Sequence, residues 1–286
     1  MSLSLDDALP EKRAARRAFD RARGFESARF VHDEARARLL ARLDVVRLRP
    51  GVAVDLGCAT GLGANSLAAR YPEARVLAVD SSAAMLHAAA AGAAPGVDVL
   101  GGDAEAWPMK SGSANLVFAN LVLPWCRPDR VFAEAARVLA DGGALMFATL
   151  GPDSLREVRA AFAAADDRIH VHAAFDMHDL GDLAMAAGLA EPVLDVDRLT
   201  VTYADVAALV RDLRAAGAVN VAGGRRRTLT GRERWRRFAA SLKPTSGRLC
   251  VTIELIFGHA WGRGPRPPRG EIRVPVERIR RPSEST

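Results

Sequence analysis

The sequence is poor in cysteine and in long apolar runs, and each shortage excludes a class of protein. Its 286 residues hold no run of 18 apolar residues that could span a membrane, and the segment 1–23 lacks the apolar core of a secretory signal. Cys58, Cys126 and Cys250 are far apart and belong to no CxxC or Cys/His cluster. We therefore expect reduced thiols, no metal site, no membrane association and a cytoplasmic location.

Lysine is almost absent, and arginine carries the positive charge. Lysine and arginine number 40 against 34 acidic residues, yet only Lys12, Lys110 and Lys243 are lysines. The net charge of +6 permits an acidic partner without identifying one, and codon bias explains the arginine content equally well. The arginines are not regularly interleaved with aromatic residues, so a nucleic-acid partner is not expected.

Short apolar runs alternate with amphipathic stretches of helical length, the pattern of a parallel sheet covered by helices. Strands are predicted at residues 52–56, 75–79, 97–100, 116–119, 144–149, 194–202 and 248–261. Helices are predicted at residues 13–43, 62–70, 83–91, 129–139, 154–164, 180–187 and 203–216. Asp141-Gly142-Gly143 is expected to be the turn into the fifth strand, and the last strand to close an edge of the sheet.

The predicted fold is therefore α/β: a doubly wound, mostly parallel seven-stranded sheet with helical cover contributed by both ends of the chain. We expect one domain over residues 1–261, with a core at 44–150, an N-terminal helical cover at 11–43 and a substrate-side, sheet-completing part at 151–261. The remaining residues, 262–286, are rich in Pro, Gly and Arg and are expected to form a mobile tail.

The strongest chemical signal is a strand that runs into a glycine-bearing turn and then a helix, Val52-Ala-Val-Asp55-Leu-Gly57-Cys-Ala-Thr-Gly61-Leu-Gly63. Gly57 and Gly61 carry no side chain that would keep a ligand from the backbone at the carboxyl edge of the sheet. The next strand leads to Asp80, 19 residues after Gly61, where a carboxylate can accept hydrogen bonds from both ribose hydroxyls. A glycine turn alone is often merely structural, but together with Asp80 it indicates a nucleoside site.

The glycine spacing favours one nucleoside over another. A dinucleotide turn reads GxGxxG and meets a pyrophosphate at a helix N-terminus, whereas the order here is GxxxGxG with Asp55 just before the turn. The Asp55 carboxylate would repel a phosphate but attract the ammonium and sulfonium groups of S-adenosylmethionine (SAM). SAM is therefore the expected cofactor.

Further candidate residues follow the next strands. Asp103 can accept a hydrogen bond from the adenine amino group, Ala104 can offer its backbone N–H, and Asn120 and Leu121 face the expected methyl-transfer position. Taken singly, Asp103 is equally well explained as a cap or turn residue and Asn120 as a strand terminator. The candidate cofactor-binding residues are Asp55, Gly57, Ala59, Gly61, Asp80, Ser81, Met85, Asp103, Ala104, Asn120 and Leu121.

With these residues in place, residues 52–149 resemble the class I SAM-dependent methyltransferases. Nearly the whole chain resembles the malonyl-acyl-carrier-protein O-methyltransferases of biotin synthesis, the BioC family. The stretches that carry this resemblance are Arg17-Ala-Phe-Asp20, Asn120-Leu-Val-Leu-Pro-Trp125-Cys126, Phe147-Ala-Thr-Leu-Gly-Pro-Asp-Ser-Leu-Arg156, His170-Val-His172, Asp176-Met-His-Asp-Leu-Gly-Asp182, Asp212-Leu-Arg-Ala-Ala-Gly217 and Gly258-His-Ala-Trp261.

The resemblance implies methyl transfer from SAM to the free carboxylate of a malonyl group on acyl-carrier protein. Such a carboxylate, with a reference pKa near ~4, is already ionised at neutral pH, so no general base is needed and no residue is assigned one. Arg156 is a candidate for positioning the carboxylate, with Trp125 as a pocket wall. A solvated helix position for Arg156 and a core position for Trp125 are the alternatives.

The chain also departs from the usual pattern of the family. Ala59 and Pro124 stand where a glycine and a Gln or His are usual, and Gly24-Phe25-Glu26-Ser27 replaces a Tyr-Asp pair. Two other functions stay open: a SAM methyltransferase for another small acceptor, and a relative that keeps the fold but not the methyl transfer, similar to an assembly factor of respiratory complex I.

A cluster of seven arginines in residues 223–237 is the candidate surface for an acidic carrier protein. Its proposed docking residues are Arg225, Arg226, Arg227, Arg234 and Arg237, and Thr230 is expected to cap a short helix that displays several of them. Little negative charge lies nearby in the sequence. The alternative is a solvated helix face.

Overall fold

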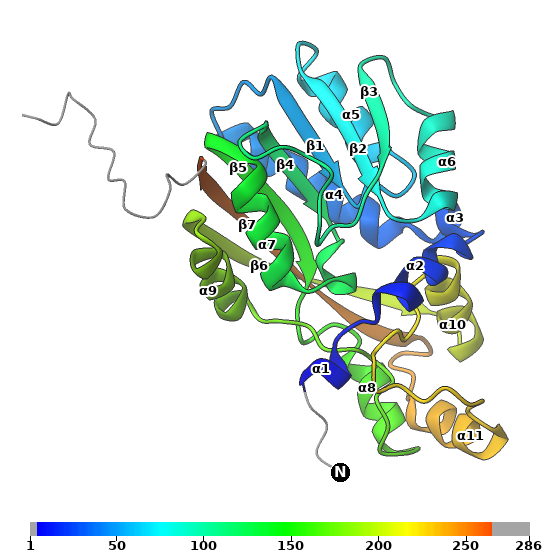
Figure 1. Ribbon diagram of the computed structural model, residues 1–286. Coiled ribbons are helices and arrows are strands. Elements are labelled where there is room, and N and C mark those ends of the chain that lie inside the picture. Colours follow the sequence, from blue (N-terminus) through cyan, green and yellow to red (C-terminus); the bar gives the residue numbers. More distant parts are fainter. Residues whose placement is uncertain (1–4, 265–286) are drawn as a thin grey trace, which may run out of the picture.

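The computed structural model describes residues 5–264, which form one seven-stranded sheet with helices on both faces (Figure 1). The strand order is β3-β2-β1-β4-β5-β7-β6, in which β1 to β5 are parallel and β7 is antiparallel to both its neighbours. The strands are β1 Val52–Leu56, β2 Arg75–Asp80, β3 Val97–Gly101, β4 Ala114–Asn120, β5 Leu139–Leu150, β6 Ala190–Tyr203 and β7 Leu249–Arg263. This architecture confirms the predicted fold class.

The helices form two layers because side chains of successive strand residues point to opposite faces of the sheet. In β1, Ala53 packs in the cluster that includes helices α4, α5 and α10, while Val54 packs in the cluster that includes α7 and α9. The helices are α1 Leu5–Ala8, α2 Lys12–Asp20, α3 Phe25–Ala28, α4 Phe30–Arg42, α5 Leu62–Arg70, α6 Ala83–Ala91, α7 Pro128–Val138, α8 Arg156–Ala163, α9 Met177–Ala187, α10 Val206–Ala215 and α11 Arg232–Ser241, with short 3-10 turns η1 Leu43–Val45 and η2 Leu123–Trp125.

Local signals explain where several helices begin and end. The Ser82 hydroxyl accepts a hydrogen bond from Met85 N at the start of α6, and the Asp176 and Asp205 carboxylates cap α9 and α10 in the same way. Gly188, with φ of 96°, ends α9. Helix α6, capped by Ser82, and helix α5, which begins directly after Gly61, both occupy the predicted residues.

The end of the sheet differs from the prediction in two respects. Strand β7 does not close an edge but lies between β5 and β6, and nearly all of its side chains are buried, as a central strand requires. The half-exposed β6 is the edge. Strand β7 also continues through Gly262 and Arg263, which the sequence assigns to the tail; residues 265–286 of the expected tail lie outside the described residues.

The predicted turn at Asp141-Gly142-Gly143 lies inside a continuous strand. Strand β5 begins at Leu139 directly after α7, and its pairing with β4 and β7 shifts register around these residues. Gly142 has a φ of 70° there. The glycines therefore form a bulge rather than a connection.

The predicted helix at residues 13–43 is divided into α2, α3, α4 and η1. The first interruption of the helix covers residues 21–24, between α2 and α3. A Cβ on Gly24 would lie 2.9 Å from the Cβ of Ala215 in α10, so the chain passes close to α10 at this point. This close approach folds the N-terminal segment back over the sheet, so that α2 contacts α6 and α3 contacts α10. Within residues 5–264, no helix combines the length and apolar composition that crossing a bilayer requires.

The strand order places a crevice at a defined point. Strand β1 pairs with β2 on one side and with β4 on the other, so the chain winds outward to β3 and then returns across β1. Open α/β sheets bind ligands outside the carboxyl ends of the strands at such a reversal. Asp55, Asp80 and Asn120 all lie at the carboxyl ends of these strands.

Candidate active site

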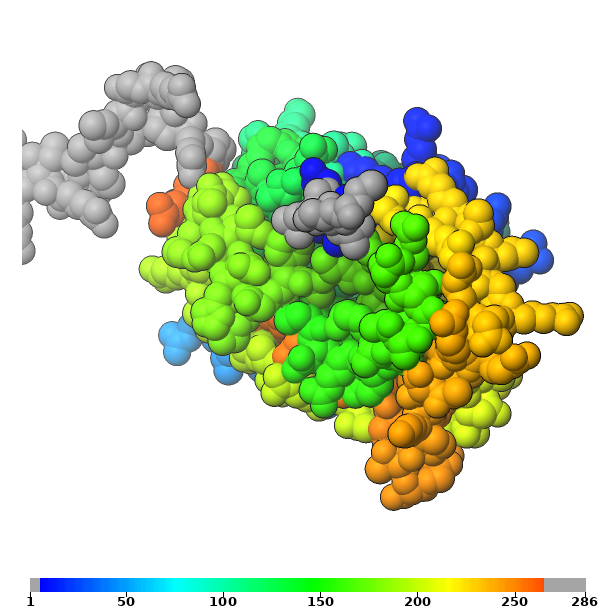
Figure 2. Space-filling model, turned by 90° about the horizontal axis from the view of Figure 1, so that it is seen from below, coloured from blue at the N-terminus to red at the C-terminus, as the bar shows by residue number. Residues whose placement is uncertain are grey.

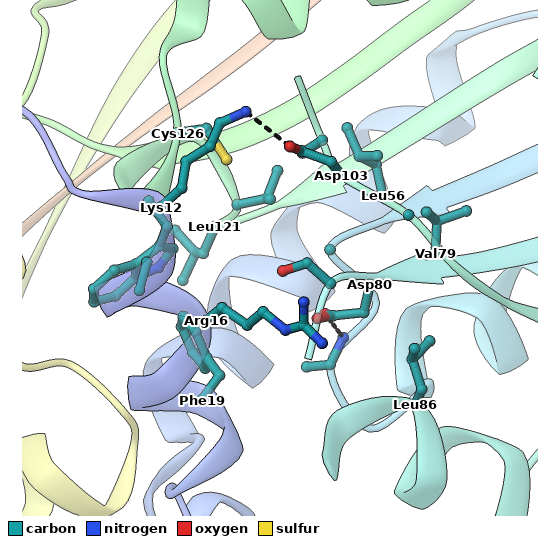
Figure 3. A pocket seen from close by; sticks show the side chains of 18 of the residues that line it. Lys12, Arg16, Phe19, Leu56, Val79, Asp80, Leu86, Asp103, Leu121 and Cys126 are labelled. Carbon is teal, nitrogen blue, oxygen red and sulfur yellow. Dashed lines mark hydrogen bonds and ion pairs between the residues drawn. The ribbon is translucent and has the colours of Figure 1, made fainter. Parts of the chain in front are cut away.

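A cavity of about 540 Å³, here called the main cavity, opens at the carboxyl ends of β1 to β4. Helix α2 contributes Lys12, Arg16 and Phe19 to it, facing the strand ends (Figure 3). The candidate residues that line it are Gly57, Ala59, Asp80, Ser81, Asp103, Ala104, Asn120, Leu121 and Trp125. The structure thus brings together residues from four strand ends and from the N-terminal cover.

Asp80 holds the glycine-bearing loop as well as facing the cavity. Its Oδ2 accepts a hydrogen bond from Ala59 N at 3.0 Å and its Oδ1 one from Ser82 N at 2.8 Å. Burial raises the pKa of this carboxyl, while these backbone donors act to lower it. The neighbouring Ser82 hydroxyl donates to Asp20 of α2 at 2.7 Å, which ties the N-terminal cover to the same loop.

Asp103 takes part both in the cavity and in a local turn. It accepts hydrogen bonds from Lys12 Nζ at 2.8 Å and from Glu105 N at 2.9 Å (Figure 3). Lys12 also pairs with Glu105, whose side chain is only 1% exposed. Asp103 is therefore both a turn residue and part of the cavity wall. Lys12, through its pairs with Asp103 and Glu105, closes this end of the cavity.

A smaller recess of about 40 Å³, here called the inner recess, adjoins the main cavity and shares Gly57, Ala59 and Asn120 with it. Four buried polar atoms of its lining have no hydrogen-bond partner among the described residues: Arg29 Nη1, His32 Nδ1, Asp55 Oδ2 and Asn120 Oδ1. Buried polar atoms are rarely left unpaired, so such a cluster marks a place where a ligand completes the bonding. One cationic donor beside carboxylate and amide oxygens suits a zwitterionic amino acid.

Asp55 can approach the start of α5 because residue 63 is glycine. A Cβ at Gly63 would lie 2.6 Å from Asp55 Oδ2. Burial, followed by the nearby Asp80, raises the pKa of Asp55 to about 7, and a backbone hydrogen bond from Ala64 opposes the rise. Half of the molecules without ligand would therefore carry a neutral Asp55 near neutral pH.

This raised pKa predicts a pH-dependent affinity for SAM. An ammonium group binds the ionised form of Asp55, so the affinity should rise by about five- to tenfold from pH 6 to pH 7.5 as the carboxyl loses its proton. Isothermal titration with SAM over this range measures the effect. Asp55→Asn should bind more weakly and without this slope; a wild-type affinity independent of pH would show that Asp55 does not meet the ammonium group.

Ala59 occupies a backbone conformation that favours glycine. Its φ is 47°, and its methyl group packs beside Phe25 and Met85. Left-handed φ values cost a residue with a Cβ about 1–2 kcal/mol, whereas the extra freedom of an unfolded glycine costs about 0.5–1 kcal/mol. An alanine in place of the usual glycine at position 59 therefore keeps the left-handed backbone geometry of the loop at a small cost in the free energy of folding.

Ala59→Gly should accordingly leave the free energy of unfolding unchanged or raise it by up to about 1 kcal/mol. Ala69→Gly, at an exposed position in α5, is the matched control and should lower it by about 1 kcal/mol. Urea denaturation measures both. If Ala59→Gly destabilises as much as the control, the positive φ at Ala59 is not a source of strain.

Trp125 lies between the main cavity and another cavity of about 340 Å³, here called the second cavity, and it lines both. Its ring makes edge-to-face contacts with Phe19 of α2, at 4.9 Å between centroids, and with His172, at 5.1 Å. Leu121, with φ of 56°, and Cys126 complete an apolar wall on the main-cavity side. Pro124 forms part of η2 and lines the second cavity, so the departure at this position adds no charged group.

Three candidate residues line neither the main cavity nor the inner recess. A Cβ at Gly61 would lie 3.2 Å from the Cβ of Ala89, so this glycine makes room for α6 rather than for a ligand. Met85 is buried against Ala22 and Phe25. Arg156 is 55% exposed, pairs with Asp153 at 3.7 Å and Glu157 at 3.2 Å, and lines neither cavity.

The N-terminal cover supplies residues that the candidate set omits, chiefly Lys12, Phe19, Arg29 and His32. Asn120 Nδ2 donates to the backbone oxygen of His32 at 3.0 Å, which fixes α4 beside the end of β4. Burial lowers the pKa of His32 to about 4, so its ring is neutral at pH 7. A helical segment with Arg and His one turn apart is a weak signal, because the same spacing is common on solvated helices.

The arginine cluster is less free than its local sequence indicates. Glu11 pairs with Arg225 at 2.9 Å and with Arg227 at 3.3 Å. Asp166 lies 3.9 Å from Arg226 and 3.6 Å from Arg234. Helix α11 begins after Gly231, without a side-chain cap from Thr230. The expectation that little negative charge balances these arginines is therefore wrong. Glu11 and Asp166, which balance part of the cluster, come from distant parts of the chain.

Comparisons with known proteins agree with this geometry. A family model described as a methyltransferase domain matches residues 54–147. The malonyl-[acyl-carrier protein] O-methyltransferase of Laribacter hongkongensis is 42% identical over 91% of this chain and 92% of its own length, and that of Gallionella capsiferriformans is 38% identical over 92% and 94%. Among solved structures, the YcgJ protein from Bacillus subtilis matches with a TM-score of 0.58 at 16% identity, covering 79% of this chain and 98% of its own, which shows the shared fold.

Proposed function

This chain belongs to the malonyl-[acyl-carrier protein] O-methyltransferase family, and we propose on that premise that it methylates the free carboxylate of malonyl-acyl-carrier protein, with SAM as methyl donor, in biotin synthesis. The observation that carries this proposal is the 42% identity over 91% of the chain with a relative of that name. The two other functions considered from the sequence, another small acceptor and a relative without methyl transfer, gain no support from the comparisons. A cytoplasmic location stays part of the proposal.

The cavity residues fit SAM. In the inner recess, the unpartnered Arg29 Nη1 would bind the carboxylate of the methionine moiety, and Asp55 Oδ2 with Asn120 Oδ1 would bind its ammonium group. Asp80 would hold the ribose hydroxyls and Asp103 with Ala104 the adenine edge. When bound, SAM supplies an electrophilic methyl group on a sulfonium sulfur.

The protein's own contribution to the reaction is alignment and exclusion of water. The acceptor carboxylate is ionised at neutral pH, so no residue has to remove a proton. The apolar wall of Leu121, Trp125 and Cys126 would strip water from the attacking oxygen and hold it in line with the methyl group. Because Arg156 lines neither cavity, we assign it no role at the reacting carboxylate.

A labelled-methyl assay with two carrier proteins tests the proposed reaction. Malonyl-acyl-carrier protein should accept the methyl group from SAM, and acetyl-acyl-carrier protein, which has no free carboxylate, should not. Equal labelling of both proteins would place the methyl group elsewhere than on the carboxylate and would contradict the proposal.

The carrier protein would meet the basic surface around α11. Arg227 is 72% exposed although it pairs with Glu11 at 3.3 Å, and Arg237 has no ion-pair partner among residues 5–264, so an acidic partner can reach both. Arg225, Arg226 and Arg234 are partly engaged with Glu11 and Asp166, which leaves them a smaller share of the docking.

Charge reversal at Arg227 and Arg237 should raise the KM for malonyl-acyl-carrier protein by up to about fivefold per residue at low salt, since an exposed pair contributes about 1 kcal/mol at most. The dissociation constant for SAM should stay unchanged. Arg47→Glu and Arg49→Glu, at exposed positions in the segment before β1, are the matched control. An unchanged KM at low ionic strength would place the docking surface elsewhere.

A further inference from the structure

The second cavity is joined to the methyl-transfer region through a shared wall. Trp125 lines both cavities, and Val219 of the second cavity packs in one cluster with Trp125 and with Ala15, which lines the main cavity. The second cavity runs between α8, α10 and the segment before α11. Helices α8 and α11 contact each other, and both lie on one face of the molecule together with the segment that precedes α11 (Figure 2).

The lining of the second cavity is apolar with a few polar groups. Val158, Phe162, Leu209 and Leu213 provide apolar walls. His172 faces it with a buried Nδ1 that has no hydrogen-bond partner among the described residues. A volume of about 340 Å³ lies within the range of pockets that enclose a small organic ligand.

Two arginines give this cavity a positive character. Arg159 donates to the backbone oxygens of Pro152 at 3.1 Å and Ser154 at 3.3 Å, which leaves other guanidinium N–H groups free. Arg214 is exposed and has no ion pair or side-chain hydrogen bond within residues 5–264. Arg159 is also close enough to His172 to contribute to the lowering of its pKa to about 4, after the larger effect of burial, so His172 is neutral at pH 7.

We propose that the second cavity is the channel through which a malonyl thioester on a phosphopantetheine arm reaches Trp125, with Arg214 binding the phosphate of the arm. This inference rests on the proposed function. The occupant follows from the lining: an alkyl and amide chain suits apolar walls with scattered donors, and its phosphate suits an exposed arginine that has no partner in the protein. Arg159 and His172 meet the carbonyl oxygens and N–H groups between the two ends.

The route also connects the two surfaces already described. Thr230 and Trp235, which belong to the arginine cluster at residues 223–237, line one end of the second cavity. Trp125 lines the opposite end of this cavity, beside the main cavity. Trp235 is 39% exposed. A carrier protein held by Arg227 and Arg237 would therefore lie on the same side as the entrance to the channel.

Filling the channel tests the proposal. Ala218→Phe should raise the KM for malonyl-acyl-carrier protein at least tenfold, with a SAM dissociation constant within twofold of wild type, since Ala218 lines only the second cavity. Leu213→Trp is a second blocking variant in case one of the two misfolds. Val193→Phe, at an exposed position on the edge strand β6, is the control and should change neither constant.

Acceptors of different length separate the contribution of the phosphopantetheine arm from that of the malonyl group. Malonyl-N-acetylcysteamine lacks the phosphate, so Arg214→Gln should raise the KM for malonyl-acyl-carrier protein several-fold and leave that for the short thioester unchanged. Ala218→Phe should affect both. Blocking variants that fold, bind SAM and keep a wild-type KM for the carrier protein would overturn the channel.

A failure of the proposed function would look different. If the wild type leaves malonyl-acyl-carrier protein unmethylated, that function is wrong, and the channel is then tested by tryptophan-fluorescence quenching with malonyl-coenzyme A. Saturable quenching in the wild type that Ala218→Phe removes would support the channel. Equal quenching in both proteins, or none in either, would overturn it.

Discussion

Asp80→Ala is expected to weaken SAM binding by at least about a hundredfold. The substitution removes the proposed acceptor of the ribose hydroxyls and leaves the N–H groups of Ala59 and Ser82 without their partner. A hydrogen bond to a charged group contributes about 1.5–3 kcal/mol, so the loss of the bonds from both ribose hydroxyls amounts to a hundredfold or more in affinity. Isothermal titration and a thermal-shift series with SAM measure the loss.

The structure also changes the expected behaviour of this variant without ligand. A carboxylate that only bound ligand could be removed without changing the melting temperature of the free protein, whereas the two backbone contacts of Asp80 predict a lower one. Asp98→Ala is the matched control, because Asp98 pairs with Arg75 on the exposed face of the neighbouring strand. The control should keep wild-type SAM affinity. Undiminished affinity in Asp80→Ala would remove Asp80 from the cofactor site.

Trp125→Ala is expected to lower kcat/KM for malonyl-acyl-carrier protein by about a hundredfold, the order of effect that misplacement of a reacting group produces. The loss opens the wall between the main and second cavities and removes the ring contacts with Phe19 and His172. Water then reaches the attacking carboxylate, and the acceptor loses its alignment. Initial-rate kinetics at saturating SAM separate this effect from cofactor binding.

Trp125→Phe distinguishes the wall from other roles of this residue. A phenyl ring keeps the apolar surface and most of the edge-to-face packing, so its kcat/KM should lie within about tenfold of wild type. The SAM dissociation constant should change little in either variant, since the polar groups proposed to bind SAM belong to other residues of the main cavity and the inner recess. Full activity of Trp125→Ala would show that Trp125 is a core residue without influence on the acceptor.

Most of the fold could be predicted from patterns within short stretches of sequence. Strands β1 to β4 are short apolar runs, α5 begins after Gly61 and α6 is capped by Ser82, so each can be read from its own residues. The carboxyl ends of the strands identified Asp80 and Asn120 as neighbours. The place of β7 between β5 and β6 depends on pairing with residues of β5 more than a hundred positions away and with residues of β6 about 50 to 70 positions away, for which a single strand pattern holds no information.

The site residues that the sequence could not identify depend on the same kind of long-range contact. Arg29 and His32 reach the inner recess because α4 folds back to Asn120, 88 positions away along the chain. Arg156 and Arg159 are one turn apart on α8, and only the packing of that helix shows that Arg159 faces the second cavity. The periodicity of a short helix does not fix its rotation against an unknown neighbour.

Pairing of the arginine cluster was likewise hidden, since Glu11 and Asp166 lie far from residues 225–234 in sequence. Charge counted along a segment of chain therefore overestimates the charge that its surface presents. Arg227 and Arg237 are the members of the cluster that a partner can reach most readily.

The mass of the acyl group after incubation with SAM and malonyl-acyl-carrier protein tests the central claim most directly. The account predicts that the carrier gains one methyl group per malonyl chain, that mild alkaline hydrolysis releases it as methanol, and that the Asp80→Ala protein forms none of this product. An unmodified malonyl group in the presence of SAM-binding wild-type protein, or a methyl group that resists ester hydrolysis, would contradict it.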